Sequence, residues 1–94
     1  MDADRVMFEI YKETTYTDRY RVVYFTELND YNKDLEIKRA LSGEHLYDGF
    51  LKRYRIDEAK QIIDRVLERL NNGEQVDTSE LDKVLAPYIP SSGI

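Results

Sequence analysis

Two segments near the start of the chain place strand-forming side chains on alternating sides and are joined by only five residues, 14–18. Because successive side chains of a strand point to opposite faces, this alternation predicts strands at about residues 5–13 and 19–28. A connection of five residues is too short for a crossover, so the two strands must be antiparallel neighbours. The sequence therefore predicts an N-terminal β-hairpin, around which the rest of the chain has to fold.

A turn centred on Tyr16 sets the register of this hairpin and decides which side chains share a face. It matches charges on one face and apolar groups on the other, in the pairs Glu13–Arg19, Tyr11–Arg21, Ile10–Val22 and Phe8–Tyr24. We expect the face that enters the core to carry Val6, Phe8, Ile10, Val22 and Tyr24. The second face then carries four other large side chains: Met7, Tyr11, Val23 and Phe25.

The second face of the hairpin needs a cover of its own. A lone two-stranded sheet is marginal in water, and its edges present unpaired backbone groups. A third strand, the chain's own helices or the hairpin of a second copy would each provide that cover. A surface bearing Met7, Tyr11, Val23 and Phe25 would be a large apolar patch for a monomer. These four residues are therefore the candidate interaction surface, for self-association or for another protein.

Residues 57–72 show the clearest helical pattern of the chain. Their apolar side chains recur at spacings of three and four, form one stripe and stop before Gly73. A shorter pattern over residues 79–86 follows a capping sequence that begins at Asp77, and Pro87 ends it. The sequence predicts a helix for each of these two segments.

The stretch between the hairpin and residue 57 is more ambiguous. Apolar residues at spacings of one, three and four predict a helix at about residues 44–54. A helix is also predicted at residues 33–42, which contain good helix formers and precede Gly43. Apolar residues two apart make a short third strand near residues 35–40 the alternative there.

These elements predict an α+β fold in which the hairpin packs against three to four helices. The length of 94 residues suits a single domain, 1–94, and the Pro, Ser and Gly residues of 90–94 predict a frayed tail. The chain has no Cys, which excludes disulfides and thiolate sites and suits a reducing compartment. No signal-peptide pattern and no long apolar run are present, so we expect a cytoplasmic protein outside the membrane.

The sequence offers little catalytic chemistry. His45 is the only histidine, and on a helix it would share a side with Asp48, three residues later, as a metal site or a general base would need. One His without a second His or a Cys is a poor ligand set, so this pair is better interpreted as a solvated helix start. The four glycines are far apart and form no phosphate-binding loop. We predict no catalytic, cofactor-binding or metal-binding residues, and the sequence favours a protein that is not an enzyme.

A basic strip is the other candidate surface. Arg19 and Arg21 of the hairpin, with Arg53 and Arg55 near Tyr54, supply the charges and rings that contact phosphates and stack on bases. The net charge of −5 disfavours a dedicated nucleic-acid binder. The leading hypothesis is thus a non-catalytic interaction or regulatory module that acts as a homodimer or as a small subunit of an assembly. A nucleic-acid accessory protein and a small enzyme or metal protein around His45 are the alternatives.

Overall fold

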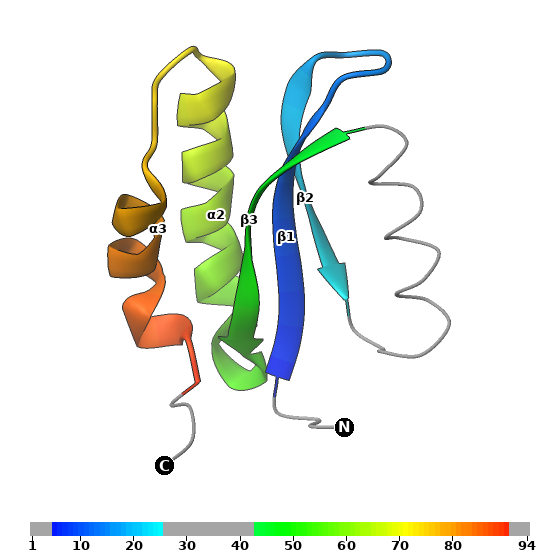
Figure 1. Cartoon of the computed structure of the whole chain (residues 1–94). Coiled ribbons are helices and arrows are strands. Elements are labelled where there is room, and N and C mark those ends of the chain that lie inside the picture. Colours follow the sequence, from blue (N-terminus) through cyan, green and yellow to red (C-terminus); the bar gives the residue numbers. More distant parts are fainter. Residues whose placement is uncertain (1–4, 26–42, 91–94) are drawn as a thin grey trace.

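The computed structural model describes residues 5–25 and 43–90, which form one three-stranded antiparallel sheet with helices on one face (Figure 1). The elements follow in the order β1 (Arg5–Glu13), β2 (Arg19–Phe25), β3 (Gly43–Lys52), the 3-10 turn η1 (Arg53–Arg55), α2 (Ile56–Asn71), α3 (Thr78–Leu85) and the 3-10 turn η2 (Ala86–Tyr88). The strand order is β2-β1-β3, so β1 is central. The α+β class is therefore confirmed. Among the described helices, none is long and apolar enough to cross a membrane.

The predicted hairpin is confirmed together with its register. β1 and β2 pair antiparallel, with Phe8 opposite Tyr24 and Glu13 opposite Arg19. The buried Glu13 carboxylate organises the turn, because it accepts hydrogen bonds from the Tyr16 and Thr17 backbone N–H groups and from the Thr17 hydroxyl. These donors stabilise the charged carboxylate, the Thr17 hydroxyl most, and so lower the pKa of Glu13. β2 is described as far as Phe25, and residues 26–28 of the predicted strand lie outside the described part.

The helix predicted at residues 44–54 is wrong, because the structure has a strand there. β3 pairs antiparallel with β1, so that Leu51 lies opposite Val6 and Tyr47 opposite Ile10. The register shifts by one residue between Tyr47 and His45, and the extra residue is Leu46. Leu46 and Tyr47 both pack against the core, and this departure from strict alternation produced the helix-like spacing.

The described residues contain two α-helices, α2 and α3, so the expectation of three to four helices exceeds what they show. The helix predicted at residues 33–42 and the alternative strand at residues 35–40 both lie outside the described residues. The third strand that the structure does show is Gly43–Lys52. The single-domain prediction and the frayed tail beyond residue 90 stay predictions.

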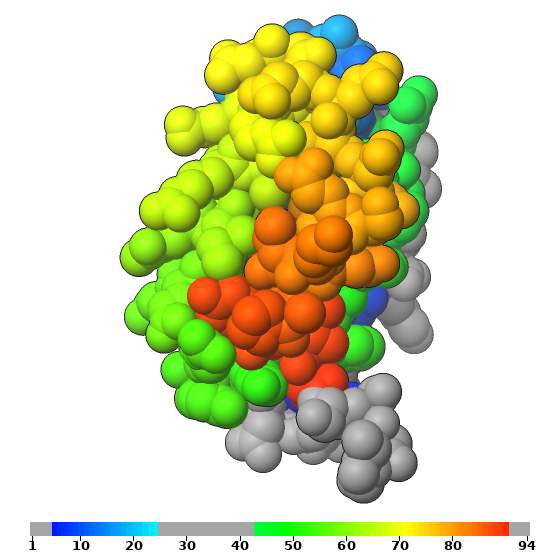
Figure 2. Space-filling view, turned by 90° about the vertical axis from the view of Figure 1, so that its left-hand side faces the viewer, coloured from blue at the N-terminus to red at the C-terminus, as the bar shows by residue number. Residues whose placement is uncertain are grey.

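The helices predicted at residues 57–72 and 79–86 are confirmed as α2 and α3, each within one residue of the expected bounds. Together they cover one face of the sheet, and Figure 2 shows them side by side in front of it. We call this sheet face the inner face and the opposite one the outer face. The core lies between helices and inner face, and its fully or almost fully buried members are Val6, Phe8, Ile10, Leu51, Ala59, Ile63, Val66, Leu70, Val76, Leu81 and Leu85.

Candidate functional site

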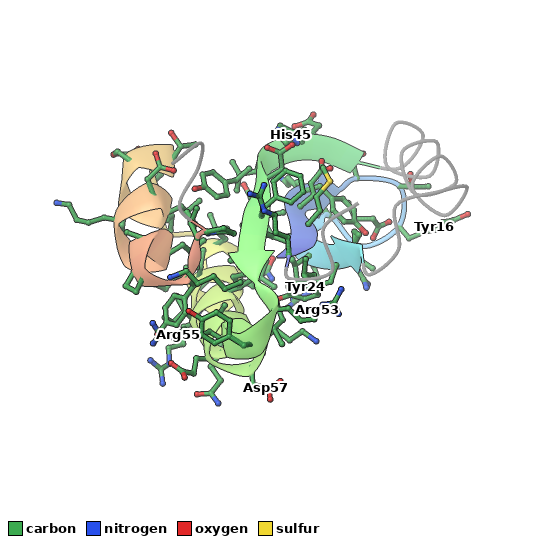
Figure 3. All side chains as sticks on the ribbon, turned by 90° about the horizontal axis from the view of Figure 1, so that it is seen from below. Tyr16, Tyr24, His45, Arg53, Arg55 and Asp57 are labelled. Carbon is green, nitrogen blue, oxygen red and sulfur yellow. The ribbon has the colours of Figure 1, made fainter. Side chains whose placement is uncertain are left out.

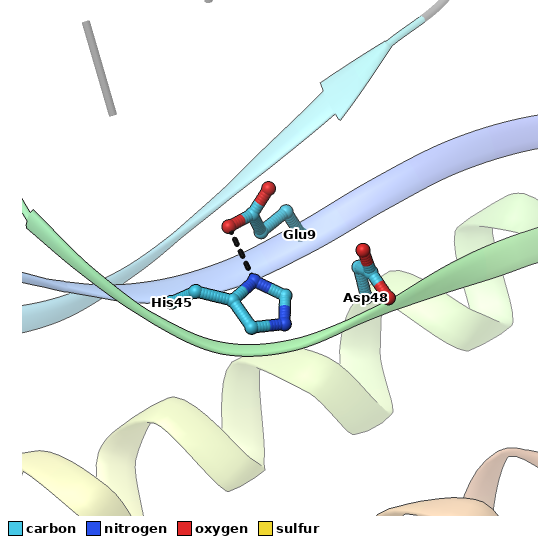
Figure 4. A group of neighbouring side chains, drawn as sticks. All are labelled: Glu9, His45 and Asp48. Atoms are coloured by element: carbon cyan, nitrogen blue, oxygen red, sulfur yellow. Dashed lines mark hydrogen bonds and ion pairs between the residues drawn. The ribbon is translucent and has the colours of Figure 1, made fainter. Parts of the chain in front are cut away.

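The bulge in β3 brings three ionisable side chains together on the outer face of the sheet (Figure 4). Glu9 of β1 and Asp48 of β3 are direct neighbours across the two strands. His45 and Asp48 are three residues apart and would face opposite ways on a regular strand, but the extra residue Leu46 returns His45 to the outer face, opposite Tyr11. One ligand atom from each of Glu9, His45 and Asp48 lies within 4.8 Å of the others.

Glu9 is the fixed member of this cluster. It sits in the middle of the central strand and has no solvent-accessible surface, whereas the His45 side chain is 49% exposed. Nδ1 of His45 lies 2.7 Å from Oε2 of Glu9, which is hydrogen-bonding distance. An ionised Glu9 accepts from an Nδ1–H, and a neutral ring then carries its lone pair on Nε2. The buried carboxylate thereby orients the ring and selects its tautomer.

This arrangement has two chemical capabilities. An oriented imidazole with a free Nε2 lone pair is both a general base and a metal ligand, and Asp48 adds a carboxylate beside it. General-base catalysis through a protein nucleophile needs a hydroxyl or thiol within hydrogen-bond reach of the base. No Ser or Thr hydroxyl in residues 5–25 and 43–90 is hydrogen-bonded to His45. The three side chains can therefore hold a cation or accept a proton at His45.

The sequence drew attention to two of the three residues but interpreted them as a solvated helix start, not as a site. His45 and Asp48 were expected to share one side of a helix, and they share one face of a bulged strand instead. Glu9 was missed, because it comes close to His45 only through the pairing of two strands. The two residues are 36 positions apart in the sequence. Its only local signal is a carboxylate placed in the middle of an otherwise strand-forming segment.

The candidate interaction surface also lies on the outer face. Met7, Tyr11 and Val23 are half-buried, and the register places Phe25 of β2 directly across from Met7. On the other side of Met7 lies Phe50 of β3, whose side chain is 41% exposed. Phe50 was not part of the predicted surface, because it was assigned to a helix. Met7 and Phe50 thus form an apolar row beside the Glu9 cluster.

The residues of the predicted basic strip lie near two opposite ends of the sheet. Arg19 pairs with Glu13 at one end of β1, whereas Lys52, which precedes Arg53, pairs with Arg5 at the other. A strand of this length separates its ends by about 26 Å. Figure 3 shows Arg55 and Tyr16 of the hairpin loop on opposite sides of the molecule, with Arg53 between them in this view. Nucleic-acid binding through these residues stays a prediction.

Arg55 has a structural role of its own. It donates to the Glu58 carboxylate at 2.8 Å and to the Pro87 carbonyl at 3.2 Å, and its guanidinium lies 4.5 Å from the centre of the Tyr88 ring. The ion pair with Glu58 raises the pKa of Arg55. These contacts tie the start of α2 to the turn after α3.

An open groove of about 550 Å³ runs between β2 and α2. Its walls carry both signs of charge, with Arg19 and Arg21 on the strand and Asp64 and Glu68 on the helix. Asn71 at the end of α2 also lines the groove and bonds the backbone of β2. Mixed charge of this kind selects no particular ligand, so the groove is secondary to the Glu9 cluster.

Comparison with protein-family models, with curated proteins and with solved structures finds no match to this chain.

Proposed function

We propose that this protein is a non-catalytic interaction or regulatory module of the cytoplasm, which works as a homodimer or as a small subunit of an assembly. The contact surface is the outer edge of β3 together with the exposed ring of Phe50. The proposal is carried by one observation, the difference between the two edges of the sheet.

The edge at β2 is engaged by the chain itself. Oδ1 of Asn71 accepts from the backbone N–H of Tyr20 at 2.8 Å, and Nδ2 of Asn71 donates to the Tyr20 carbonyl at 3.2 Å. The side-chain amide thus makes the pair of hydrogen bonds that a residue of a neighbouring strand would make. A further strand cannot pair at Tyr20 without displacing Asn71.

Within the described ranges, no contact like that of Asn71 engages the edge at β3, and its backbone makes no backbone hydrogen bond outside its own sheet. β3 ends the sheet and contains no Pro, and beyond the bulge at Leu46 its residues 47–52 pair regularly with β1. A regular edge segment of this kind is a template for pairing with another strand. Twofold pairing of two β3 edges would join two three-stranded sheets into one.

Phe50 supports the same surface. The residue is 41% exposed and lies on the outer face next to Met7, with the guanidinium of Arg5 6.0 Å from the centre of its ring. An exposed aromatic ring beside an open strand edge supplies apolar area where pairing would bury it. The predicted interaction surface then becomes continuous with the edge through Met7.

The test is the mass of the tag-free protein, measured by size-exclusion chromatography with light scattering from low to high micromolar concentration. We expect a dimer that dissociates on dilution. Phe50→Lys places a charge beside Arg5 and should shift the midpoint of dissociation to at least about tenfold higher concentration.

Tyr16→Lys is the matched control, because it makes the same kind of change at a ring that is 91% exposed on the hairpin loop. It should leave the dimer intact. Equal effects of both variants would remove β3 from the proposal. A monomer at every concentration, with no partner recovered from lysate, would overturn the proposal itself.

A further inference from the structure

We propose that Glu9, His45 and Asp48 form a binding site for one divalent first-row transition-metal ion, of which Zn²⁺ is the representative. His45, through Nε2, and Asp48 are the direct ligands, and Glu9 is the buried partner that holds the imidazole ring. The site is separate from the proposed pairing edge in its chemistry, and it stands whether or not the protein is a dimer.

The bulge in β3 assembles the site. A regular β3 would send His45 to the inner face, among the core side chains, and the cluster would not exist. The single extra residue, Leu46, reverses the direction of every side chain on one side of it, and His45 joins Asp48 on the outer face. Bulges of this kind commonly re-aim side chains next to functional sites. The distortion therefore has a definite chemical result, the approach of the one histidine to two carboxylates.

Charge also favours a cation at this position. Glu9 and Asp48 are directly opposite on adjacent strands, and two ionised carboxylates in that position repel. A divalent cation bound beside them offsets this repulsion.

The ligand set suits a transition-metal ion. Imidazole nitrogen suits Zn²⁺, Ni²⁺, Cu²⁺ and iron, whereas Mg²⁺ and Ca²⁺ prefer sites made of oxygen alone. A metal-bound His commonly donates its other ring N–H to a carboxylate, which fixes the ring and strengthens the ligand. The 2.7 Å contact between His45 Nδ1 and Glu9 Oε2 is this arrangement. With two direct protein ligands, the remaining coordination positions belong to water.

The three side chains are already close to one another. One ligand atom from each lies within 4.8 Å of the others, whereas ligand atoms around Zn²⁺ at bond lengths of about 2.0–2.2 Å lie about 3.4 Å apart, so metal binding draws the cluster together. The two direct ligands belong to exposed residues, and Figure 4 shows the imidazole ring next to the Glu9 carboxylate, with Asp48 on the same side of the sheet. Glu9, in the central strand, need not move.

The experiment uses tag-free full-length protein, equilibrium dialysis against ZnCl₂ and metal analysis of the protein compartment. We expect one strongly preferred equivalent of Zn²⁺. Because His45 is the only histidine of the chain, its ring protons give unambiguous NMR signals, and these should shift or broaden during the same titration. Asp48→Asn should weaken binding by at least about tenfold, and His45→Ala should abolish the preferred equivalent.

Asp57→Asn is the control, since Asp57 is an exposed carboxylate at the start of α2 and lies away from the cluster (Figure 3). It should bind Zn²⁺ as the wild type does. Asp48→Asn keeps the proposal testable even if His45→Ala unfolds the protein, because Asp48 is exposed. The site is overturned if millimolar Zn²⁺ leaves the His45 signals unchanged, or if Asp48→Asn and Asp57→Asn bind equally.

Discussion

The two faces of the sheet carry different kinds of side chain on the same three strands. On the inner face, β1 places Phe8 and Ile10 in one apolar cluster with residues of α2 and α3, and Val6 is also buried. On the outer face, the same strand places Glu9 between Met7 and Tyr11. One face is explained by the removal of apolar surface from water, and the other contains a buried carboxylate that burial alone disfavours.

This difference separates the side chains that stabilise the fold from those that the fold does not require. A small domain depends on its one core for nearly all of its stability, and the inner face supplies that core. A buried ionic group contributes little net stability compared with apolar residues of similar size. The stability of the core therefore does not account for the Glu9 cluster and its bulge, and metal binding is our proposal for them. The following substitutions compare the two faces directly.

The largest difference is expected between neighbouring residues of β1. Phe8→Ala removes a fully buried ring that packs against Tyr47 at 5.9 Å between ring centres, and should reduce the free energy of unfolding by about 3–5 kcal/mol. Met7→Ala, on the outer face and half-buried, should cost about 1–2 kcal/mol. Urea denaturation followed by circular dichroism measures both. Equal losses would mean that the outer face is a second core, and the comparison would fail.

Two glycines of β3 give a smaller contrast. A Cβ at Gly43 would lie 2.6 Å from Cδ2 of Tyr11 and 2.7 Å from the Lys12 carbonyl oxygen, so the backbone has to shift. Gly43→Ala should therefore cost about 1–3 kcal/mol. A Cβ at Gly49 would meet only the Phe8 ring, at 3.3 Å, and the gain from replacing a strand glycine roughly offsets this tight contact.

We expect Gly49→Ala to unfold within about 1 kcal/mol of the wild type in the same urea experiment. If Gly49→Ala lost more stability than Gly43→Ala, the packing against the Phe8 ring would tolerate an added methyl group less well than the contact of β3 with Tyr11.

The sequence predicted the hairpin and its register because every determinant of them is local. The alternation in both strands, the short connection and the opposite charges of Glu13 and Arg19 all act within about twenty residues. The helices α2 and α3 were predicted for the same reason, since an apolar stripe with clear stop signals lies within each segment.

β3 could not be predicted in this way. Its alternation is interrupted at Leu46, so the local spacing of apolar residues favoured a helix. Its stability as a strand comes from pairing with β1, far away in the sequence, where Gly49 allows the close approach of Phe8. Without β3, the candidate site could not be predicted either. His45 and Asp48 were noted for their residue types, but Glu9 joins them only through that long-range pairing.

The smallest expected effect concerns two tyrosines of the inner face. The Tyr24 hydroxyl is buried and has no hydrogen-bond partner in the described structure, whereas the Tyr47 hydroxyl donates to Asp82. Removal of an unsatisfied buried hydroxyl is neutral or favourable, so Tyr24→Phe should be as stable as the wild type or about 1 kcal/mol more stable at neutral pH. Tyr47→Phe loses a hydrogen bond and should be about 0.5–1.5 kcal/mol less stable.

The pH dependence gives this prediction a second measurement. Burial, and to a smaller extent the charge of Asp64, raises the pKa of Tyr24 above its ordinary value of 10.0. A raised pKa means that the folded state favours the neutral phenol, so this contribution to stability is fully present below pH 10 and is lost as the pH rises above 10. Above pH 10, Tyr24→Phe should therefore lose less stability than the wild type. Part of the loss should remain in this variant, because burial also raises the pKa of Tyr47. Identical alkaline profiles for the wild type and Tyr24→Phe would mean that the Tyr24 hydroxyl reaches solvent, and the inner face would then be less completely closed than its apolar side chains indicate.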